Sequence, residues 1–280
     1  MHPVVSQLVQ LQELLLIRDE QKVAIGAGSE HLDHLDTSIQ SMTSKLPKDT
    51  RTLFEKLQKK DHIVIAPVAD GICAVCGMTL PISLVQAVRL AREIHSCPTC
   101  ARMLYYPESP ARRVGKRPRR SEPKKVGMAR FSAETLMIPR LQSTDKSGVI
   151  TELAYKMEDE GFVDKAEKLV EGAMERESII STAIGHGLAV PHVRGVEGGG
   201  LSLAMGISGK GIRWDENAKK LTRIVFFIVI PTAAAAFYLK LLSGLSETFS
   251  KADARKAITS EKDPAKLWKA LVKVTRSTIK

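Results

Sequence analysis

Two groups of residues in this chain have types and spacings that could do chemistry. The four cysteines, the only ones among 280 residues, stand in two close pairs, Cys73 with Cys76 and Cys97 with Cys100. The second group centres on His192, which follows a proline at the end of a segment containing two glycines. Paired thiolates are typical metal ligands, and a neutral imidazole is a good nucleophile. The residues therefore predict a metal site and, separately, a site of group transfer.

The spacing of the cysteines, C-x2-C-x20-C-x2-C, suits a tetrahedral zinc ion. Zinc takes four thiolates at about 2.3 Å, and each C-x2-C turn supplies two of them. No fifth donor stands at ligand spacing in the sequence, so we expect one structural zinc per chain. Gly77 permits a tight turn after the first pair, whereas Ala101 stands in the matching place after the second. Four free buried thiols or a redox dithiol are the alternatives, and the paired spacing favours zinc.

His192 has the setting that phosphoryl transfer requires of a histidine. Imidazole is nucleophilic while neutral, and its phosphoramidate passes phosphate on readily. Such a histidine should be half exposed, with one nitrogen fixed by a hydrogen bond and the other open. Pro191 stiffens the backbone before His192, and Gly185 and Gly187 permit close backbone approach. A Pro-His pair alone is weak evidence, because most single histidines are merely hydrogen-bonded polar groups.

The excess of basic residues is concentrated in one short segment. The net charge of the chain is +11, and residues 112–130 hold nine basic residues against one acidic residue. Residues 112–125 also contain Gly115, Pro118 and Pro123 and almost nothing apolar, which predicts a flexible linker. A solvated spacer is one interpretation of this segment, and contact with a polyanion through residues 112–125 is the other.

Nothing in the sequence predicts export or membrane insertion. The first residues have no basic start followed by a long apolar core. The longest apolar stretch, residues 224–237, contains Pro231 and Thr232 and is too short to span a bilayer. Two close cysteine pairs fit metal ligation in a reducing compartment better than secreted disulfides. We therefore expect a cytoplasmic protein.

The elements that must position the cysteines are helical at first and then strand-like. The first 60 residues are predicted to form helices, and one of them carries an apolar seam from Leu32 to Leu46, with Ser29 as its N-cap. Two arrangements remain open: an antiparallel helical hairpin, or a small bundle that packs on its own ribbon. Residues 62–69 form a strand-like apolar run that leads into the first cysteine pair.

From Phe131 onward the pattern becomes mixed α/β. Strands are predicted at residues 136–138, 201–207 and 224–230, and the last is fully apolar, as a central position in a sheet demands. Mixed strands and helices over about 150 residues predict one layered domain. The predicted helices are residues 147–158, 164–175, 232–249 and 263–274, with Asp263 as the cap of the last.

Residues 1–106 resemble the four-cysteine zinc-ribbon family that carries a long N-terminal helical hairpin. The resemblance rests on Val68-Ala-Asp-Gly-Ile-Cys-Ala-Val-Cys76 and on Cys97-Pro-Thr-Cys-Ala-Arg-Met-Leu-Tyr105. It implies a bacterial cytoplasmic protein whose hairpin and ribbon contact another protein that the sequence does not name. This family usually has glycine where Ala101 stands.

The segment Met174-Glu-Arg-Glu-Ser-Ile-Ile-Ser-Thr-Ala-Ile-Gly-His-Gly-Leu-Ala-Val-Pro-His-Val-Arg194 is similar to the type-2 IIA domain of the bacterial phosphoenolpyruvate-dependent phosphotransferase system, the fructose/mannitol and nitrogen-regulatory class. The similarity extends from Phe131 to Lys273. It implies a mixed sheet flanked by helices, in which His192 accepts phosphate on Nε2 from HPr or a related carrier. It also implies that Arg176 and Thr182 line the site and that the transfer uses no metal.

One position departs from that family. Tyr238 stands where the family commonly has a second histidine, which helps to hold the phosphoryl group. Tyrosine can donate one hydrogen bond but carries no charge, so Tyr238 is predicted to support the site without replacing that charge. His186, in the same glycine loop as His192, is a candidate to compensate.

Together the patterns predict an α+β chain in four parts. Residues 1–61 form a helical, coiled-coil-like hairpin, residues 62–108 a four-cysteine zinc ribbon, residues 109–130 a basic flexible linker and residues 131–280 the IIA type-2 domain. The leading hypothesis is a regulatory histidine phosphocarrier with an attached module for protein contacts. The alternatives are a non-catalytic IIA-like scaffold, and a zinc-ribbon regulator that binds protein or nucleic acid.

Overall fold

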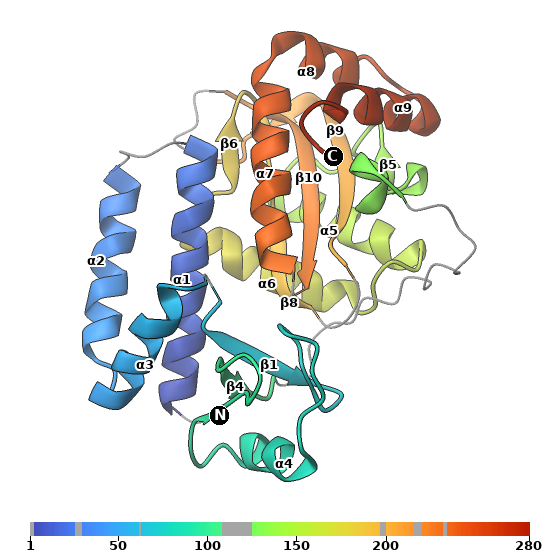
Figure 1. Cartoon of the computed structure of the whole chain (residues 1–280). Coiled ribbons are helices and arrows are strands. Elements are labelled where there is room, and N and C mark those ends of the chain that lie inside the picture. Colours follow the sequence, from blue (N-terminus) through green and yellow to red (C-terminus); the bar gives the residue numbers. More distant parts are fainter. Residues whose placement is uncertain are drawn as a thin grey trace. The chain divides into compact units, whose positions relative to one another are not determined.

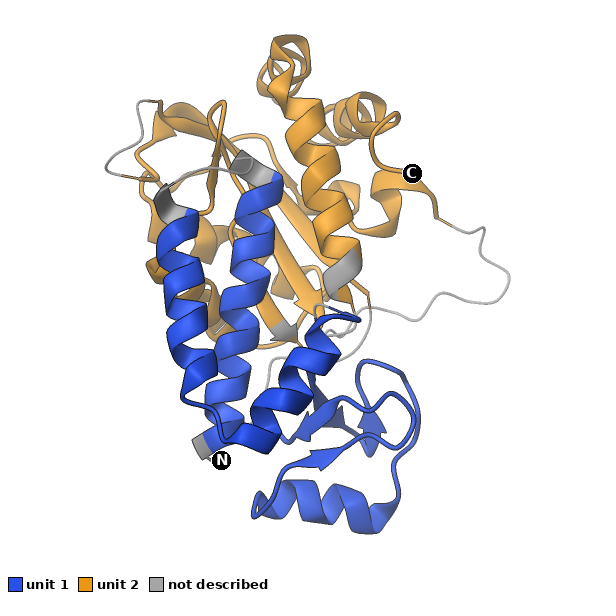
Figure 2. Cartoon of the chain, turned by 60° about the vertical axis from the view of Figure 1, so that its left-hand side comes forward, with its two compact units in different colours: residues 1–109 blue, residues 110–280 orange. Residues whose placement is uncertain are grey.

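The computed structural model describes residues 3–25, 30–61, 63–107, 125–196, 200–215, 220–231 and 234–280. The chain forms two compact units, residues 1–109 and 110–280, which Figure 2 shows in two colours. Most of the segment predicted as a linker, together with the predicted N-cap Ser29, lies outside the described residues. The end of that segment is folded, because the 3-10 helix η1 (Gly127–Arg130) buries Met128 in the core of the second unit.

The first unit begins with three helices, α1 (Pro3–Ile25), α2 (Glu30–Ser44) and α3 (Lys48–Gln58). Figure 1 shows α1 and α2 side by side. The apolar seam predicted for the second helical segment points into the core of this unit, and its buried members are Leu32, Leu35, Ile39 and Leu46.

A small sheet follows the helices and contains the cysteines. Its strands lie in the order β2-β1-β4-β3, with β1 and β4 parallel and the outer pairs antiparallel. Helix α4 (Ile82–Leu90) connects the two halves of the sheet. The strands are short: β1 (Ile65–Ala69), β2 (Ile72–Cys73), β3 (His95–Ser96) and β4 (Met103–Tyr105).

The helices of the first unit pack on this sheet, so the two arrangements left open by the sequence do not exclude each other. Phe54 of α3 is fully buried in a core that includes Val64 and Ile65 at the start of the sheet. Gln12 of α1 joins the two layers directly. Its side chain accepts hydrogen bonds from the N–H groups of Val64 (2.7 Å) and Ile65 (2.9 Å) and donates one to the carbonyl of Ile65 (3.2 Å). The first unit therefore combines the predicted helical hairpin, α1 and α2, with packing of the helices on their own ribbon.

The second unit is built on a six-stranded mixed sheet with helices on both faces. Strand β10 lies at the centre and pairs antiparallel with β9 on one edge and parallel with β7 and β8 on the other. Figure 1 shows α7 on one side of this sheet and α5 and α6 on the other. The strands are β5 (Met137–Ile138), β6 (Ala183–Gly185), β7 (Leu188–Ala189), β8 (His192–Val196), β9 (Ser202–Ile212) and β10 (Thr222–Pro231). The helices are η2 (Glu134–Leu136), α5 (Lys146–Asp159), α6 (Ala166–Ile179), α7 (Ala235–Ser250), α8 (Ala252–Thr259) and α9 (Pro264–Thr275).

The predicted fold class, α+β with a mixed sheet flanked by helices, is confirmed. Asp263 caps α9 as expected, since its side chain accepts a hydrogen bond from the N–H of Lys266 at 3.0 Å. The sequence did not predict β6, β7, β8 or α8. These strands are too short to show alternation, and β7 and β8 exist through pairing with β10.

No helix in the described part of the chain combines the length and the apolar character needed to cross a bilayer.

Candidate functional site

A break in one edge of the central sheet positions His192. Strands β7 and β8 lie end to end along β10, with Leu188 opposite Ile224 and His192 opposite Ile228. Pro191 lies in the break, where its missing N–H costs no ladder hydrogen bond, and its carbonyl still accepts from the N–H of Ile228 at 3.0 Å. His192 is therefore the first residue of a strand whose backbone is fixed by β10.

The hydrogen bonds of His192 assign its tautomer. Nδ1 lies 3.0 Å from the carbonyl oxygen of Val190 and 3.2 Å from the hydroxyl oxygen of Tyr238. Because a carbonyl oxygen can only accept, Nδ1 carries the proton and donates it to Val190. In the neutral ring the lone pair then lies on Nε2, which is the nucleophilic nitrogen.

His192 is more deeply buried than the sequence argument required. We expected a half-exposed side chain, but His192 and Tyr238 are each only 1% exposed. Their ring centroids lie 5.0 Å apart, so the tyrosine of α7 covers the histidine. A molecule from outside can therefore reach Nε2 only if side chains at this end of the sheet move.

The structure adds Arg194 to the site, a residue that the sequence analysis did not select. Arg194 lies two residues after His192 on β8, so both side chains leave the strand on the same face. Its guanidinium carbon lies 5.2 Å from the centroid of the Tyr238 ring. Alternation along a strand would have placed Arg194 on the same face as His192. That inference requires knowing that residues 192–196 form a strand. Arg194 brings a permanent positive charge to the ring of Tyr238.

Arg176 and Thr182 are both buried at the end of α6 and the residues that follow it. Arg176 donates from Nη1 to the carbonyl of Ile180 at 2.9 Å. The Thr182 hydroxyl donates to the Glu177 carboxylate at 2.6 Å, and the Thr182 carbonyl accepts from the N–H of Val190 at 3.0 Å. Thr182 thus holds the residue whose carbonyl fixes the ring of His192.

His186 lies in a different place from His192, so it does not compensate for Tyr238. It is in the β6–β7 turn with φ +53°, next to the start of β10. The turn of His186 leads into Leu188, which pairs with Ile224 of β10, whereas His192 pairs with Ile228. The four-residue step from Ile224 to Ile228 corresponds to about 13 Å along the strand.

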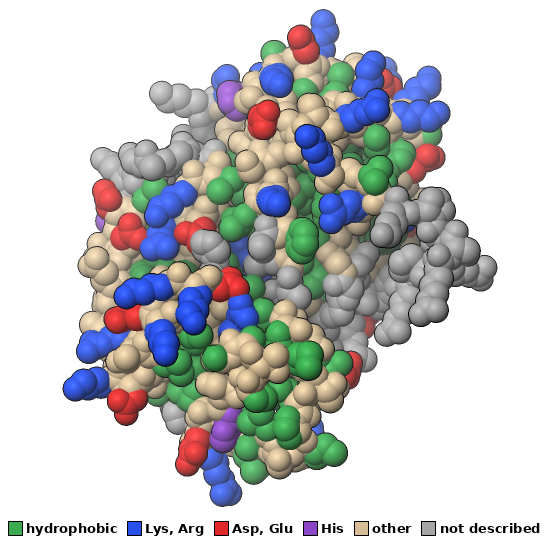
Figure 3. Space-filling model, in the orientation of Figure 1, with side chains coloured by type: hydrophobic (Ala, Val, Ile, Leu, Met, Phe, Trp, Pro, Cys, Tyr) green, Lys and Arg blue, Asp and Glu red, His purple; other side chains and the backbone are tan. Residues whose placement is uncertain are grey.

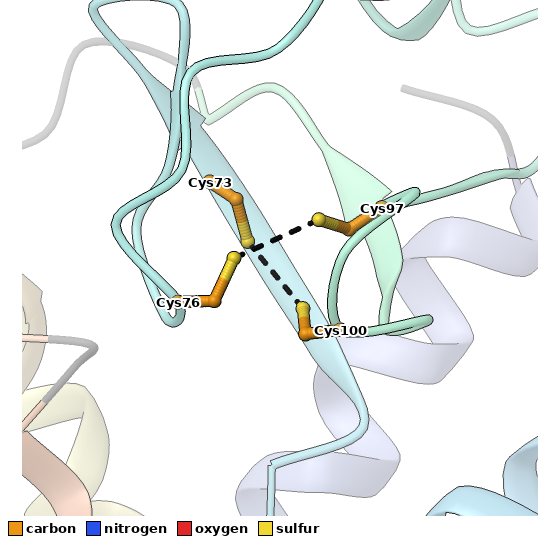
Figure 4. Close-up of side chains that lie close together, drawn as sticks. All are labelled: Cys73, Cys76, Cys97 and Cys100. Atoms are coloured by element: carbon orange, nitrogen blue, oxygen red, sulfur yellow. Dashed lines mark hydrogen bonds between the residues drawn. The ribbon is translucent and has the colours of Figure 1, made fainter.

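The four cysteine sulfurs point toward one another from two turns (Figure 4). All four lie within 4.8 Å of one another, with 3.8 Å between Cys73 and Cys100 and 3.7 Å between Cys76 and Cys97. Four sulfurs at about 2.3 Å from a central ion lie about 3.8 Å apart at the corners of a tetrahedron. The spacing of the thiols therefore fits zinc.

The two cysteine turns have the same backbone geometry although only one contains glycine. Gly77 and Ala101 have φ values of +73° and +60°, and each donates its N–H to the carbonyl of the first cysteine of its pair, at 2.8 and 2.9 Å. Ala101 therefore adopts the left-handed conformation that glycine adopts more readily.

Burial and Arg102 act on the thiols in opposite directions. Burial raises the pKa of Cys73 to about 12. It also acts to raise the pKa of Cys100, but hydrogen bonds from the backbone N–H and guanidinium of Arg102, together with those from Cys97 and Cys76, lower that pKa to about 7. The same guanidinium donates to the carbonyl of Ile63 at 2.8 Å and pairs with Asp61. Arg102 therefore connects the cysteine site to the end of the helical bundle.

The fold and the two sites agree with known families. The family described as "Phosphoenolpyruvate-dependent sugar phosphotransferase system, EIIA 2" matches residues 131–274, and the "C4-type zinc ribbon domain" matches residues 72–104. The chain belongs to the EIIA type-2 family of the phosphotransferase system. Its four cysteines are the ligands of one structural zinc ion, and the predicted fusion of the two domains is confirmed.

Curated relatives match less than half of the chain. The fructose-specific EIIA component of Haloferax volcanii is 29% identical over 113 residues, which are 40% of this chain and 73% of that protein. The fructose-specific EIIABC component of Bacillus subtilis is 28% identical over 118 residues, and the 2-O-alpha-mannosyl-D-glycerate-specific EIIABC component of Escherichia coli is 25% identical over 130. The chain spans only 19% and 20% of those two longer proteins.

Solved structures of low sequence identity are also similar. Nitrogen regulatory protein IIA-Ntr from Neisseria meningitidis is 22% identical with a TM-score of 0.45 and covers 50% of this chain and 96% of its own. IIA mannitol from Escherichia coli is 17% identical with a TM-score of 0.43 and covers 49% and 96%. CT398 from Chlamydia trachomatis is 24% identical with a TM-score of 0.26 and covers 28% and 34%.

Proposed function

We propose that this chain is a phosphoryl carrier of the phosphoenolpyruvate-dependent phosphotransferase system, and that Nε2 of His192 accepts the phosphate from an HPr-like carrier. The observation that supports this most is the hydrogen bond from Nδ1 of His192 to Val190, because it leaves the lone pair on Nε2. The family membership of residues 131–274 supports the same reaction class. The proposal places the reaction in the cytoplasm, where such carriers meet.

The transfer needs no metal and no external base. The lone pair of Nε2 attacks the phosphorus of the donor's phosphohistidine, the phosphorus–nitrogen bond of the donor breaks, and its electron pair returns to the donor ring. Positive charge grows on the ring of His192 as the new bond forms. The Val190 carbonyl, which accepts the Nδ1 proton, stabilises that charge.

Arginines supply the positive charge that the phosphoryl oxygens require. Arg194 leaves β8 on the same face as His192 and stacks on Tyr238, so it can replace the charge that tyrosine lacks. We assign Arg176 a supporting part, because it ties the end of α6 to Ile180 near the site. Thr182 positions Val190 and so acts on His192 indirectly.

The N-terminal unit is proposed to make the protein contacts of a regulatory carrier. Its zinc ribbon and helices form one packed body through Gln12 and Phe54. In this proposal the phosphorylation state of His192 changes what that body binds.

A non-catalytic scaffold is the second candidate, and one observation favours it. His192 and Tyr238 are almost fully buried, which is unusual for a residue that must meet another protein. If the covering tyrosine does not move, the domain keeps the fold of a carrier without its activity.

Phosphate labelling separates the two candidates. The full chain is incubated with labelled phosphoenolpyruvate, enzyme I and HPr, next to His192→Ala, His186→Ala and Arg194→Gln. We expect label on the wild type and on His186→Ala, none on His192→Ala, and labelling at least about tenfold slower on Arg194→Gln, because a charged hydrogen bond is lost. Arg140→Gln, a basic residue of the same unit on the other edge of the sheet, is the matched control.

The outcomes are distinct. Label that persists in His192→Ala and disappears in His186→Ala would reassign the acceptor. A wild type that takes no label from any tested carrier, although it is folded, would support the scaffold. The nitrogen-15 chemical shifts of His192 provide an independent check, since we expect the lone pair on Nε2 in the unphosphorylated protein.

A further inference from the structure

A second charged site lies in the C-terminal unit, away from His192. A cavity of about 400 Å³ opens where the β6–β7 turn, the start of β10 and helix α8 meet. Figure 3 shows Lys and Arg side chains gathered over the end of this unit that carries α8 and α9. Leu221 and Ile224 give the cavity an apolar wall. Its polar lining consists of basic side chains and one hydroxyl: His186, Lys220, Arg223, Arg255, Lys256 and Thr259.

The positive charge in this cavity is not balanced by carboxylates of the described residues. None of the residues that line it is acidic. In the part of the chain that the structure describes, Lys220, Arg223 and Lys256 form no ion pair. Like charges around so small a volume repel one another, and a bound anion converts that repulsion into attraction.

The backbone holds the turn of His186 against Arg223. The Gly187 carbonyl accepts hydrogen bonds from the N–H groups of Arg223 at 2.8 Å and Ile224 at 3.1 Å. A Cβ at Gly187 would lie 3.1 Å from the carbonyl oxygen of Leu221, and φ there is +77°. A side chain at Gly187 would therefore be both crowded and strained, so glycine favours this close approach of the turn to β10 at the wall of the cavity.

Arg255 is fixed on the opposite wall. Its Nη1 donates to the carbonyl oxygens of Phe249 at 2.5 Å and Ser250 at 2.7 Å, at the C-terminal end of α7. A guanidinium has five N–H donors in a rigid fork, so other donors remain to meet oxygen atoms. Anchoring reduces the entropy that this side chain would lose on binding a ligand.

The size of the cavity favours a small molecule over a nucleic acid. Small-ligand sites occupy about 300–1,000 Å³ and combine an apolar wall with a few convergent polar groups. Phosphates prefer clusters of arginine and lysine, whereas a carbon skeleton suits Leu221 and Ile224. A single-stranded nucleic acid would instead require an extended basic track with aromatic platforms.

We propose that this cavity binds a small phosphorylated metabolite, with its phosphate oxygens on the basic side chains and its carbon skeleton against Leu221 and Ile224. The site is separate from His192, which lies about 13 Å further along β10. The inference goes beyond the phosphoryl-carrier function and does not depend on it.

Calorimetric titration of the full chain tests the proposal. Fructose 1,6-bisphosphate and ATP probe two sources of phosphate, and inorganic pyrophosphate probes phosphate without a carbon skeleton. We expect saturable one-to-one binding of at least one organic phosphate, more tightly than pyrophosphate. Arg223→Ala and Lys256→Ala should each weaken it at least about tenfold, because each removes a charged hydrogen bond. Lys269→Ala, an exposed lysine on α9 outside the cavity, is the matched control and should bind as the wild type does.

Three results would overturn the proposal. One is no binding of any probe at about 1 mM, the weak end of useful affinity. Another is binding that Arg223→Ala and Lys256→Ala, shown by circular dichroism to be folded, leave unchanged. The third is tighter binding of a single-stranded oligonucleotide than of every small phosphate. Labelling of His192 is followed in the same variants, and we expect it to be unchanged, so a failed carrier function and a failed binding site give different results.

Discussion

The hydroxyl oxygen of Tyr238 lies 3.2 Å from Nδ1 of His192, the nitrogen that also donates to Val190. Tyr238 therefore contacts the ring at its protonated nitrogen. It covers the histidine and helps to orient it, but it adds no charge.

Replacing Tyr238 by histidine should raise the rate of phosphoryl transfer. The smaller ring opens the cover over His192 and can carry a positive charge when protonated. The space left behind should lower the free energy of unfolding by about 1–3 kcal/mol, because Tyr238 is buried. The rate of labelling from HPr measures the first effect and urea unfolding the second.

Tyr238→Phe is the matched control, because it keeps the ring packing and removes only the hydroxyl. We expect a loss of less than about tenfold in rate, since one neutral hydrogen bond contributes about 1 kcal/mol. A Tyr238→His variant that labels no faster than Tyr238→Phe would show that tyrosine does not limit the transfer.

The buried carboxylate of Glu177 should be the most sensitive polar group of the second unit. It accepts hydrogen bonds from the Thr182 hydroxyl at 2.6 Å and from Trp214 Nε1 at 2.9 Å. Glu177→Ala would leave those buried donors without an acceptor, so we expect a loss of about 3 kcal/mol in the free energy of unfolding. Urea unfolding followed by tryptophan fluorescence measures it. Glu175→Ala, on the same helix, is the control and should change stability by less than about 0.5 kcal/mol.

Replacing Ala101 by glycine should stabilise the left-handed turn at this position. Ala101 has φ +60°, where glycine avoids a strain of about 1–2 kcal/mol but loses more entropy on folding. We expect Ala101→Gly to stabilise the first unit by about 0.5–1 kcal/mol. Ala74→Gly, within the first cysteine turn, is the control and should not stabilise. Equal shifts in melting temperature for both variants would contradict the assignment of strain to Ala101.

Removal of zinc should unfold the ribbon and spare the second unit. The cysteines close a small core with few buried residues, so the metal supplies much of the folding free energy of the ribbon. A chelator, or Cys97→Ser, should reduce the circular dichroism signal of the first unit. Both tryptophans, Trp214 and Trp268, lie in the second unit, so their fluorescence should not change. Ser96→Ala is the control, and elemental analysis that found no zinc in the native protein would contradict the site.

Local patterns in the sequence were sufficient for the metal site and for most long elements. The metal site could be predicted from the paired spacing of Cys73, Cys76, Cys97 and Cys100, because each C-x2-C turn brings two thiolates together locally. The apolar run that became β10 and the cap at Asp263 likewise depend on neighbouring residues alone. Family resemblance then selected His192, which no local pattern could distinguish from an ordinary buried histidine.

Only the tertiary structure decided how the histidine is held. The tautomer of His192 depends on its hydrogen bond with the carbonyl of Val190. The side chain that covers His192 is Tyr238 of helix α7, which lies 46 residues away in the sequence. Arg194 belongs to the site because residues 192–196 form the strand β8 by pairing with β10. Strand β8 is too short to be predicted from the sequence. The distance between His186 and His192 was also decided by the tertiary structure. It is set by where β7 and β8 pair along β10, which the sequence alone does not show.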